Sequence, residues 1–433
     1  MLDINMCQRL IVHINIPKSE MNVNSLVSYC KKMSQSFSHE LFQAIIIEFQ
    51  QRVLSLVLGK RWHPRQPDPA PWHCPCCGSR YGFKRRGRRK RSLKTSHGTV
   101  HFAVFQVTCC DCGKTFSPFP KLLGIAHGHC LTREFEQLIC RVVKDMSYRK
   151  TSGLFAQLAD APVSAHTVHR VVQRYGQCAE IVENKAAIDH WQYDSTKIKA
   201  SANKRGIDVH LAIAIGKKTT RYHRVHCEKT LVNVQVARSP SQLKKILKNT
   251  PITQLTVDGL SGLTGYISKK KLDVPVQRCL WHIPKTAAHM LYRDGVDKQQ
   301  RRELVRPLKK FLFDENRSVC ERLLCYQNTI NAFTDYQYEK TVTFLTRAFP
   351  YLFTYKTHKD KNKNNIYERT ISITERLMRE INRRFENGAR WTPQGAENLL
   401  TVKLIDELNN PQSYDYLWKL KNQIKATFQV ILC

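Results

Sequence analysis

Three acidic residues far apart in the sequence are the candidates for catalytic chemistry. Asp194 lies within an expected strand, and Asp258 ends a short apolar strand directly before Gly259. Glu375 lies on an expected helix over residues 372–384. Hard divalent cations such as Mg²⁺ bind carboxylate oxygens. Two such ions roughly 4 Å apart can activate the attacking oxygen and stabilise the leaving oxygen in phosphoryl transfer. The order of strand Asp, strand-end Asp and helix Glu therefore predicts a metal-dependent phosphoryl-transfer site.

Each of these acids also has a simpler interpretation. An Asp at a strand end is often a turn residue or a helix N-cap. Glu375 could form a surface ion pair with Arg379, one helical turn later. Other acids lie close enough in the sequence to replace the first or the third candidate, namely Asp189, Asp208, Glu368 and Glu380. The element order favours the original three.

Two Cys-x-x-Cys-Gly motifs predict a structural metal site. Four thiolates in two such pairs match the tetrahedral coordination of Zn²⁺, and each glycine permits the tight turn that the motif needs. We expect a zinc ribbon over residues 72–120 with the ligands Cys74, Cys77, Cys109 and Cys112. The alternatives are four buried or redox-active cysteines, or ligation by Cys76 and Cys110, which would break the two-residue spacing.

A dense cationic run lies between the two cysteine motifs, where a hairpin of the ribbon is expected. It contains no acidic residue that could neutralise it, which favours contact with nucleic-acid phosphates over a merely solvated surface. Its basic residues are Lys84, Arg85, Arg86, Arg88, Arg89, Lys90 and Arg91.

Residues 130–178 predict a helix-turn-helix. One helix is expected over residues 147–158, a turn follows, and Ser164 is a suitable N-cap for a second helix that ends near Gly176. Ala165, Val168 and Val172 would face a core. The polar side chains left for DNA contact are His166, His169, Arg170, Gln173 and Arg174. Short helix pairs also serve purely structural roles, so DNA recognition competes with that interpretation.

From about residue 186 the pattern predicts an α/β layer. Three strands in series, a helix, a strand, a helical segment and a last strand indicate mixed strand directions. The expected strands cover residues 191–199, 208–215, 221–227, 254–257 and 274–279, and the expected helix covers 241–248. Residues 285–365 are helical, polar and lysine-rich, which indicates an insertion.

The two ends of the chain predict further helices. Apolar residues recur at helical spacing over residues 38–58, so residues 1–63 are interpreted as a helical leader. The closely spaced prolines of residues 64–71 favour an extended linker. A C-terminal helix is expected over residues 406–433. The sequence indicates no role for either end.

The charge balance points to a polyanionic partner. Among 433 residues, 70 are Lys or Arg and 35 are Asp or Glu, a net charge of +35. Such an excess repels itself unless a polyanion neutralises it, so nucleic acid is the first partner to consider and an anionic membrane the second. The sequence contains no run of about 20 apolar residues and no signal peptide. We therefore expect a cytoplasmic, nucleoid-associated protein whose 16 cysteines are reduced or bind metal.

Together these motifs resemble the Mutator-like DDE transposases of prokaryotic insertion sequences over residues 72–405. The resemblance rests on the Cys-Pro-x-Cys-Gly ribbon, the helix pair, the two aspartates with their neighbours, and the helix that carries Glu375. It also rests on Cys279-x-x-His282, a marked feature of that group, and on Gly395-Ala-Glu-Asn-Leu399. From spacing alone, Cys279 and His282 could equally be core residues or half of a zinc site.

The resemblance implies a fold and a set of roles. It implies an α/β, RNase H-like catalytic core over residues 186–405, interrupted by the helical insertion and preceded by the ribbon and the helix-turn-helix. Asp194, Asp258 and Glu375 would be catalytic ligands of Mg²⁺ or Mn²⁺, and Cys279 and His282 an accessory pair. The enzyme would hydrolyse a phosphodiester and join the freed 3′-hydroxyl to target DNA.

The expected partners are double-stranded DNA, as element ends and as target, and a second copy of the chain. Two DNA ends must be handled together, so a homodimer or higher oligomer is expected, and no membrane. Two other functions stay open from the residues: a non-catalytic DNA-binding regulator with the same ribbon and helix pair, and an RNase H-like nuclease that cuts without joining.

Overall fold

A computed structural model of the 433-residue chain was analysed. It divides into two compact units, and their boundary falls between Val171 and Val172, within helix α5 (Ala165–Cys178). The residues that the structure describes are 23–58, 69–123, 125, 130–178, 190–199, 206–221, 224–259, 261–357, 369–385 and 391–408.

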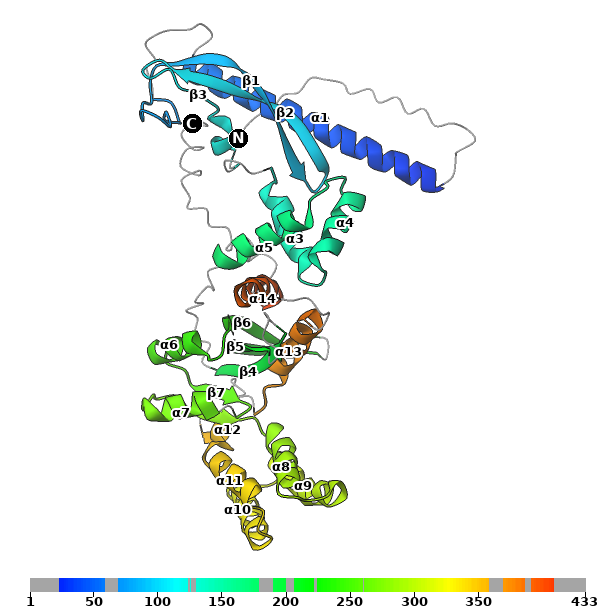
Figure 1. Cartoon of the computed structure of the whole chain (residues 1–433), viewed down its shortest axis with the longest axis vertical. Helices are drawn as coiled ribbons and strands as arrows, with labels where there is room; N and C mark the ends of the chain where they lie inside the picture. The colour runs from blue at the N-terminus through cyan, green and yellow to red at the C-terminus, as the bar shows by residue number, and fades with distance from the viewer. Residues whose placement is uncertain are drawn as a thin grey trace. The chain divides into compact units, whose positions relative to one another are not determined.

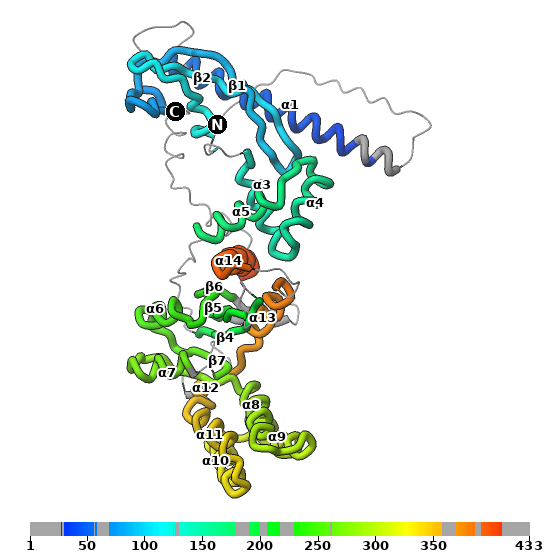
Figure 2. The backbone as a smooth tube through the Cα atoms, in the orientation of Figure 1, coloured from blue at the N-terminus to red at the C-terminus, as the bar shows by residue number. Residues whose placement is uncertain are grey.

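The first unit contains a long β-hairpin that packs against one helix. Strands β1 (Phe83–Thr95) and β2 (Gly98–Cys109) are antiparallel, and the short β3 (Thr115–Phe116) pairs with β2. Helix α1 (Val23–Leu58) runs alongside the hairpin in Figure 2. Apolar residues of both elements form one core, including Phe49, Val53, Leu93 and Phe102.

Helix α1 begins well before residue 38, where the helical pattern was expected to begin. The apolar spacing marks only the part of the helix that contacts the hairpin, whereas Val27 is 63% exposed. A buried glutamine also joins α1 to β2 by two hydrogen bonds. Gln50 donates to the carbonyl of Ala103 at 2.9 Å and accepts from the amide of Phe105 at 2.9 Å. The leader is therefore helical from Val23, and residues 1–22 and 59–63 lie outside the described part.

A group of helices follows the hairpin. These are α2 (Phe119–Leu122), α3 (Arg133–Val143), α4 (Tyr148–Leu158) and α5. The side chain of Ser147 accepts the amide of Lys150 and begins α4, and Ser164 accepts the amide of Thr167 at 3.1 Å and begins α5. The rings of Phe135 and Phe155 pack 5.0 Å apart between α3 and α4.

The second unit is built on a five-stranded mixed sheet with the strand order β6-β5-β4-β7-β8. Strand β5 is antiparallel to both β4 and β6, whereas β7 is parallel to both β4 and β8. The strand bounds are β4 His190–Ile198, β5 Ile207–Arg221, β6 Arg224–Val236, β7 Gln254–Val257 and β8 Val276–Arg278. The mixed α/β architecture predicted from the sequence is thus confirmed.

Helices cover both faces of this sheet. Helices α6 (Ser241–Asn249) and α7 (Ser261–Lys269) lie on one side in Figure 1, and α13 (Ser372–Phe385) lies on the other. Leu243, Leu263 and Trp191 belong to the core beneath α6 and α7. The last described helix, α14 (Pro393–Leu408), contacts β6. The helix expected over 406–433 lies outside the described residues from residue 409 onward.

The third strand was misplaced from the sequence. It was expected over 221–227, but Arg221 ends β5 and pairs with Arg224, which begins β6. Strand β6 then continues to Val236. The polar ends of the two strands lack an apolar alternation that would mark the turn, and the buried Leu231 and Val234 lie beyond the expected end.

The expected insertion is a helical body with its own core. It contains α8 (His282–Arg293), α9 (Lys298–Phe313), α10 (Val319–Asp335), α11 (Glu339–Ala348), the 3-10 turn Phe349–Tyr351 and α12 (Thr354–Thr357). Leu308, Tyr326, Phe333 and Leu345 are among its buried residues. The body therefore does not need the sheet for most of its apolar burial.

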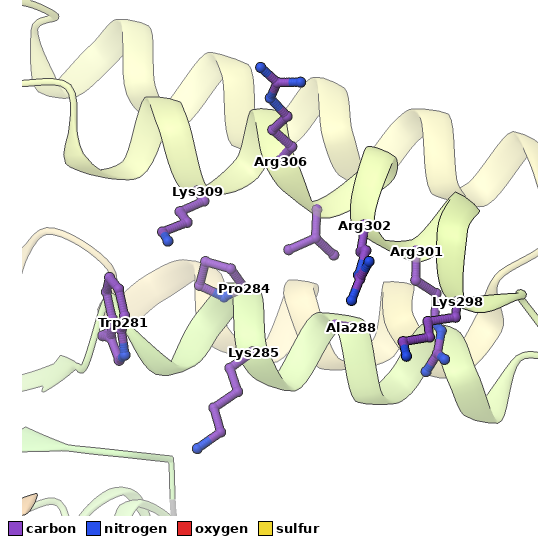
Figure 3. Close-up of a pocket in the computed structure, with 10 residues that line it drawn as sticks. Trp281, Pro284, Lys285, Ala288, Lys298, Arg301, Arg302, Arg306 and Lys309 are labelled. Atoms are coloured by element: carbon purple, nitrogen blue, oxygen red, sulfur yellow. The ribbon is translucent and has the colours of Figure 1, made fainter.

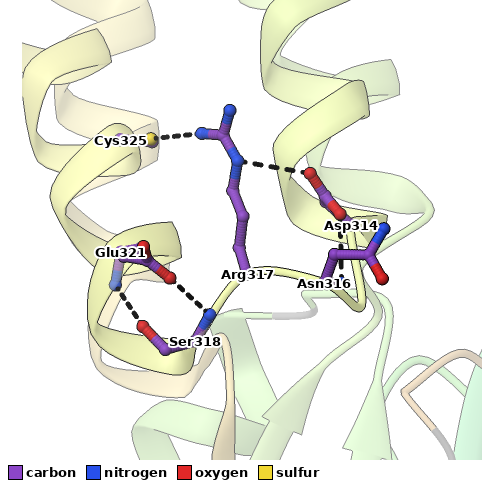
Figure 4. Close-up of polar contacts among 6 residues, drawn as sticks. All are labelled: Asp314, Asn316, Arg317, Ser318, Glu321 and Cys325. Atoms are coloured by element: carbon purple, nitrogen blue, oxygen red, sulfur yellow. Dashed lines mark hydrogen bonds and ion pairs between the residues drawn. The ribbon is translucent and has the colours of Figure 1, made fainter.

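The connection between α9 and α10 is fixed by local polar contacts (Figure 4). Ser318 and Glu321 form a reciprocal capping box at the start of α10, which satisfies two backbone amides that the helix leaves unpaired. Arg317 forms an ion pair with Asp314 at 3.2 Å and donates to Cys325 at 3.0 Å. The two helices therefore meet at a defined turn.

The two ends of the insertion meet beside the sheet. The amide of Leu280, just after β8, donates to the carbonyl of Arg369 at 3.0 Å. The Arg369 side chain also forms an ion pair with Glu315 at 2.8 Å and lies over the ring of Phe313. The chain thus leaves and re-enters the core at one place. No described helix has both the length and the apolar character needed to cross a membrane.

Candidate active site and cysteine cluster

One face of the central strand pair is a row of polar residues that ends in two aspartates. Successive side chains of a strand alternate between the two faces of a sheet. His190, Gln192 and Asp194 therefore share one face of β4, and Thr256 lies opposite Gln192 in the parallel register with β7. The last pair in that register is Tyr193 with Val257, so Asp194 and Asp258 follow it at the same end of adjacent strands.

Asp194 occupies an environment that disfavours its charged form. Its side chain is buried, and it accepts the amide of Ser195 at 2.8 Å. Burial raises the pKa of Asp194 to about 7, and the negative charges of Asp258 and Glu375 add to the rise. The amide of Ser195 and the charge of Lys285 lower it only in part. A buried carboxylate beside two other carboxylates is harder to ionise than a free one, and nearby positive charge favours its charged form.

The turn after Asp258 is shaped by a glycine and an arginine. Gly259 has a φ of +124°, a conformation that side chains disfavour. A Cβ atom at this position would lie 2.0 Å from Nη2 of Arg278. Arg278 donates to the carbonyl of Gly259 at 3.4 Å and lies over the ring of Phe344. Burial lowers the pKa of this guanidinium, while Asp258 raises it. The expected sharp turn at Asp258-Gly259 is present.

Gln192 joins the helix of Glu375 to the sheet. It is fully buried two residues before Asp194. Its amide nitrogen donates to the carbonyl of Thr370 at 3.1 Å, and its oxygen accepts the hydroxyl of Thr374 at 3.0 Å. Both partners flank the start of α13, so the glutamine fixes where Glu375 enters the site. A polar residue on the face that carries Asp194 was the sequence signal that could have identified it.

Glu375 contacts a histidine from the insertion. Its Oε1 lies 3.1 Å from Nε2 of His282. Burial lowers the pKa of His282, although the charges of Glu375 and Asp258 raise it in part, so a neutral imidazole that donates a hydrogen bond fits this contact. No ion pair joins Glu375 to Arg379 among the described side chains. The surface pairing considered from the sequence is therefore replaced by a contact inside the site.

Cys279 is a buried residue beside the site, near enough to Glu375 for that charge to add to the rise that burial causes in the pKa of its thiol. Its side chain is 1% exposed, and its amide donates to the carbonyl of Val257 at 2.7 Å. Burial raises the pKa of its thiol, while the backbone amides of Ile371 and His282 lower it. Cys279 therefore lies where β7, the start of α8 and the segment before α13 converge. His282, three residues later, is the member of the pair that contacts a carboxylate.

The weaker acidic candidates take other positions. Asp208 lies opposite Lys197 in the pairing of β4 with β5, and Glu380 forms a surface ion pair with Arg383 at 3.0 Å. Asp189 and Glu368 lie outside the described residues. Asp194, by contrast, interacts electrostatically with both Asp258 and Glu375.

The three carboxylates fit a hard divalent cation by their chemistry. Their oxygens are the ligand type that Mg²⁺ and Mn²⁺ prefer, and the charges of Asp258 and Glu375 add to the rise in the pKa of Asp194 that burial causes. Nδ1 of His282 is also buried without a hydrogen-bond partner among the described atoms. The carboxylates are less tightly grouped than the cysteines of the ribbon.

The cysteine cluster matches the predicted zinc site. The sulfur atoms of Cys74, Cys77, Cys109 and Cys112 all lie within 4.8 Å of one another, the one group of three or more potential ligands found that close among the described residues. Gly78 and Gly113 follow the two motifs with φ values of +74° and +70°. Cys76 and Cys110 are exposed and lie outside the cluster. These four cysteines could hold Zn²⁺, and the alternative ligands Cys76 and Cys110 do not belong to the group.

The basic run lies along the exposed length of β1. Every residue from Lys84 to Lys90 is exposed and Arg91 is half-buried. The guanidinium of Arg88 lies 4.6 Å from the ring centre of Phe105 on the paired strand. The hairpin therefore presents a strip of positive charge, as the sequence predicted.

Helix α5 presents most of the side chains expected to contact DNA. His166, His169 and Arg170 are exposed, Arg174 is half-buried, and Val168 and Val172 are in the core. The expectation for Gln173 was wrong. Its oxygen accepts the side chain of Asn398 at 2.7 Å, because α14 covers this part of the helix.

Comparison with known families gives one match. The family described as "Transposase, Mutator family" matches residues 77–410, which is more than half of the chain. The comparison with curated proteins found no match.

Proposed function

Because the chain belongs to the Mutator family of transposases, we propose that Asp194, Asp258 and Glu375 form the DDE-type catalytic site of a DNA transposase in an RNase H-like core. Membership in the family implies a DNA-binding enzyme that cuts and joins strands. The observation that carries the proposal is the meeting of three carboxylates from β4, the end of β7 and α13. The order and directions of the five strands support the core assignment.

Mg²⁺ or Mn²⁺ would be held by these three carboxylates. When bound, such ions supply Lewis-acid activation of the attacking oxygen and stabilisation of the leaving oxygen. To serve as a ligand Asp194 would have to be deprotonated, which the positive charge of Lys285 favours. Gln192 and His282 orient Glu375 through the start of α13 and its carboxylate. Arg278 holds the turn that presents Asp258.

DNA recognition is assigned to the first unit and α5. The cationic strip on β1 contacts backbone phosphates, and His166, His169, Arg170 and Arg174 on α5 contact an element end. Phosphate contacts position a protein on DNA, whereas base contacts give sequence specificity. The four cysteines of the cluster would hold Zn²⁺, which would stabilise the base of the hairpin. Two copies of the chain join two element ends.

The decisive experiment replaces one carboxylate by an amide of the same shape. Glu375→Gln in the full chain removes a ligand charge, so cleavage of element-end DNA in Mg²⁺ should be lost while DNA binding persists. Glu380→Gln is the matched control, because Glu380 lies on the same helix and only pairs with Arg383 at the surface. Wild-type cleavage by the Glu375→Gln protein would refute the assignment of the third ligand.

A second readout separates a transposase from its two alternatives. Wild-type protein with element ends, a target plasmid and Mg²⁺ should yield DNA in which an element 3′ end is joined to the plasmid. Cut ends without joined product would indicate a nuclease. Binding without cutting would indicate a regulator.

A further inference from the structure

A cationic groove runs between the first two helices of the insertion (Figure 3). Helices α8 and α9 are antiparallel neighbours, and the space between them is about 620 Å³. Six of its ten lining residues are Lys or Arg, and none is acidic. The cations are Lys285, Lys298, Arg301, Arg302, Arg306 and Lys309.

The groove has little counter-charge in the protein, although Lys285 acts electrostatically on Asp194. No ion pair joins any of these six side chains to a carboxylate within the described part of the chain. Figure 3 shows Arg302 and Lys309 extending from α9 toward α8, whereas Arg306 points the other way. Pro284, Ala288 and Val305 supply the small apolar part of the lining. Cations this close repel one another unless a polyanion is bound, so the groove favours an anionic ligand.

Aromatic rings hold a cation at each end of the groove. The ammonium group of Lys309 lies 4.6 Å from the ring centre of Trp281, and the guanidinium of Arg301 lies 4.9 Å from that of Tyr292. Trp281 and Tyr292 remain largely exposed. These pairs fix two charges near opposite ends of α8. Eleven residues of helix separate the two rings, which corresponds to about 16 Å at roughly 1.5 Å per residue.

That length matches several phosphates of a nucleic-acid strand. One strand of B-form DNA carries a phosphate about every 3.4 Å along the helix axis. The groove therefore spans about five phosphates. A single small anion such as inorganic phosphate would leave most of the six cations unneutralised, so the repeating charge of a strand is the better fit.

The groove adjoins the candidate active site. Trp281 directly precedes His282, which contacts Glu375. Lys285 lines the groove, extends from α8 toward the sheet in Figure 3, and lowers the pKa of Asp194. A strand lying in the groove would thus reach the carboxylates without crossing another part of the insertion.

We propose that the α8–α9 groove binds the sugar–phosphate backbone of the DNA strand that enters the active site. The groove would give the insertion a function in substrate binding, separate from the hairpin and α5. Recognition would be by phosphate charge and independent of sequence. The proposal rests on the proposed function, since it assigns the groove's ligand as that enzyme's substrate.

The first test maps the contact on the wild-type chain. Lysine acetylation is measured by mass spectrometry with and without a duplex oligonucleotide. Lys298 and Lys309 should be protected by DNA, whereas the exposed Lys310 and Lys269, which do not line the groove, should react equally in both samples. Equal acetylation of Lys298 and Lys309 with and without DNA would overturn the proposal.

The second test measures the charge contribution of the groove. The Arg302→Gln/Lys309→Gln protein is compared with Lys310→Gln/Arg347→Gln, which removes the same charge from exposed positions of the insertion outside the groove. The slope of log affinity against log salt should fall by up to about 1.8 in the groove variant, because each lost phosphate contact removes about 0.9. The control slope should not change.

The outcomes distinguish the groove from the proposed function. A groove variant with the wild-type salt slope, in a chain that cuts DNA in Mg²⁺, would overturn the groove and leave the transposase assignment intact. Protection of Lys298 and Lys309 in a chain that cuts no DNA would support the groove as a DNA-binding surface and count against the catalytic assignment.

Discussion

The imidazole of His282 lies 3.1 Å from the carboxylate of Glu375. The first residue begins the helical insertion and the second lies beyond its end, on α13. The contact therefore links the insertion to Glu375, the last of the three candidate acids in the sequence. The two residues of the Cys-x-x-His motif therefore differ in their surroundings. Cys279 is buried, whereas His282 contacts and orients a carboxylate.

Replacing His282 should impair the site without unfolding it. We expect His282→Ala to lower Mg²⁺ affinity or the cleavage rate about 10- to 100-fold, the usual effect of losing a residue that orients a metal ligand. Cleavage rate as a function of Mg²⁺ concentration measures both effects. His289→Ala on the exposed side of the same helix is the control. Equal rates for wild type and His282→Ala would contradict the positioning role.

Asp194→Asn should stabilise the metal-free protein at alkaline pH. Folding raises the pKa of Asp194 from 3.8 to about 7, so the native state retains a proton that the unfolded state releases between these values. Stability therefore falls as pH rises through this window and stays reduced above pH 7. At about 1.4 kcal/mol per pKa unit, the Asn variant should be more stable by a few kcal/mol at pH 8.

Thermal unfolding in EDTA at a series of pH values checks the Asp194 prediction. The melting temperature of Asp194→Asn should exceed that of the wild type at pH 8, and the difference should shrink as the pH is lowered toward 5. A constant difference across this range would show that packing, and not the carboxylate charge, causes it.

The cysteine cluster should bind one zinc ion through the four predicted ligands. Cys112→Ser removes one thiolate from the group, so zinc should be lost from the purified protein and the first unit should melt at a lower temperature. Cys110→Ser is the matched control, because Cys110 lies in the same motif but is exposed and outside the cluster. Atomic absorption measures the zinc content of both variants. Loss of zinc from both alike would contradict the assignment of the four ligands.

Neutralising the cationic strip on β1 should flatten the salt dependence of DNA binding. Arg86→Gln/Arg89→Gln removes two exposed charges from the strand. If both contact phosphates, the slope of log affinity against log salt falls by nearly two. Fluorescence anisotropy over a range of salt concentrations measures the slope. An unchanged slope would make the strip a solvated surface.

The positions of the two aspartates could be predicted because they follow from strand periodicity. Alternating polar and apolar residues lead to Asp194 on β4 and to Asp258 after β7, and parallel pairing then brings both to one sheet end. The cysteine ligands were equally predictable from their spacing. The aspartate positions and the cysteine ligands depend on local geometry, which residue spacing in the sequence predicts.

Contacts between distant elements could not be predicted in this way. The choice of His282 as the partner of Glu375 depends on how the insertion folds, and the role of Gln192 depends on where α13 docks. Gln173 was assigned to DNA because the pattern of one helix cannot reveal that α14 covers it. Likewise, the polar turn between β5 and β6 gave no apolar alternation from which to place it.

The hydrogen bond between Leu280 and Arg369 joins the two ends of the insertion to each other beside the sheet. Because these two ends are already held together, the entropy of closing a longer connection between them grows only slowly with its length. The spacing in sequence between Asp258 and Glu375 is therefore decoupled from their spacing in space. Changes in the length of the outer helices α9 to α11 would leave the carboxylates in place, whereas α8 contacts Glu375 and α12 is hydrogen-bonded to β8.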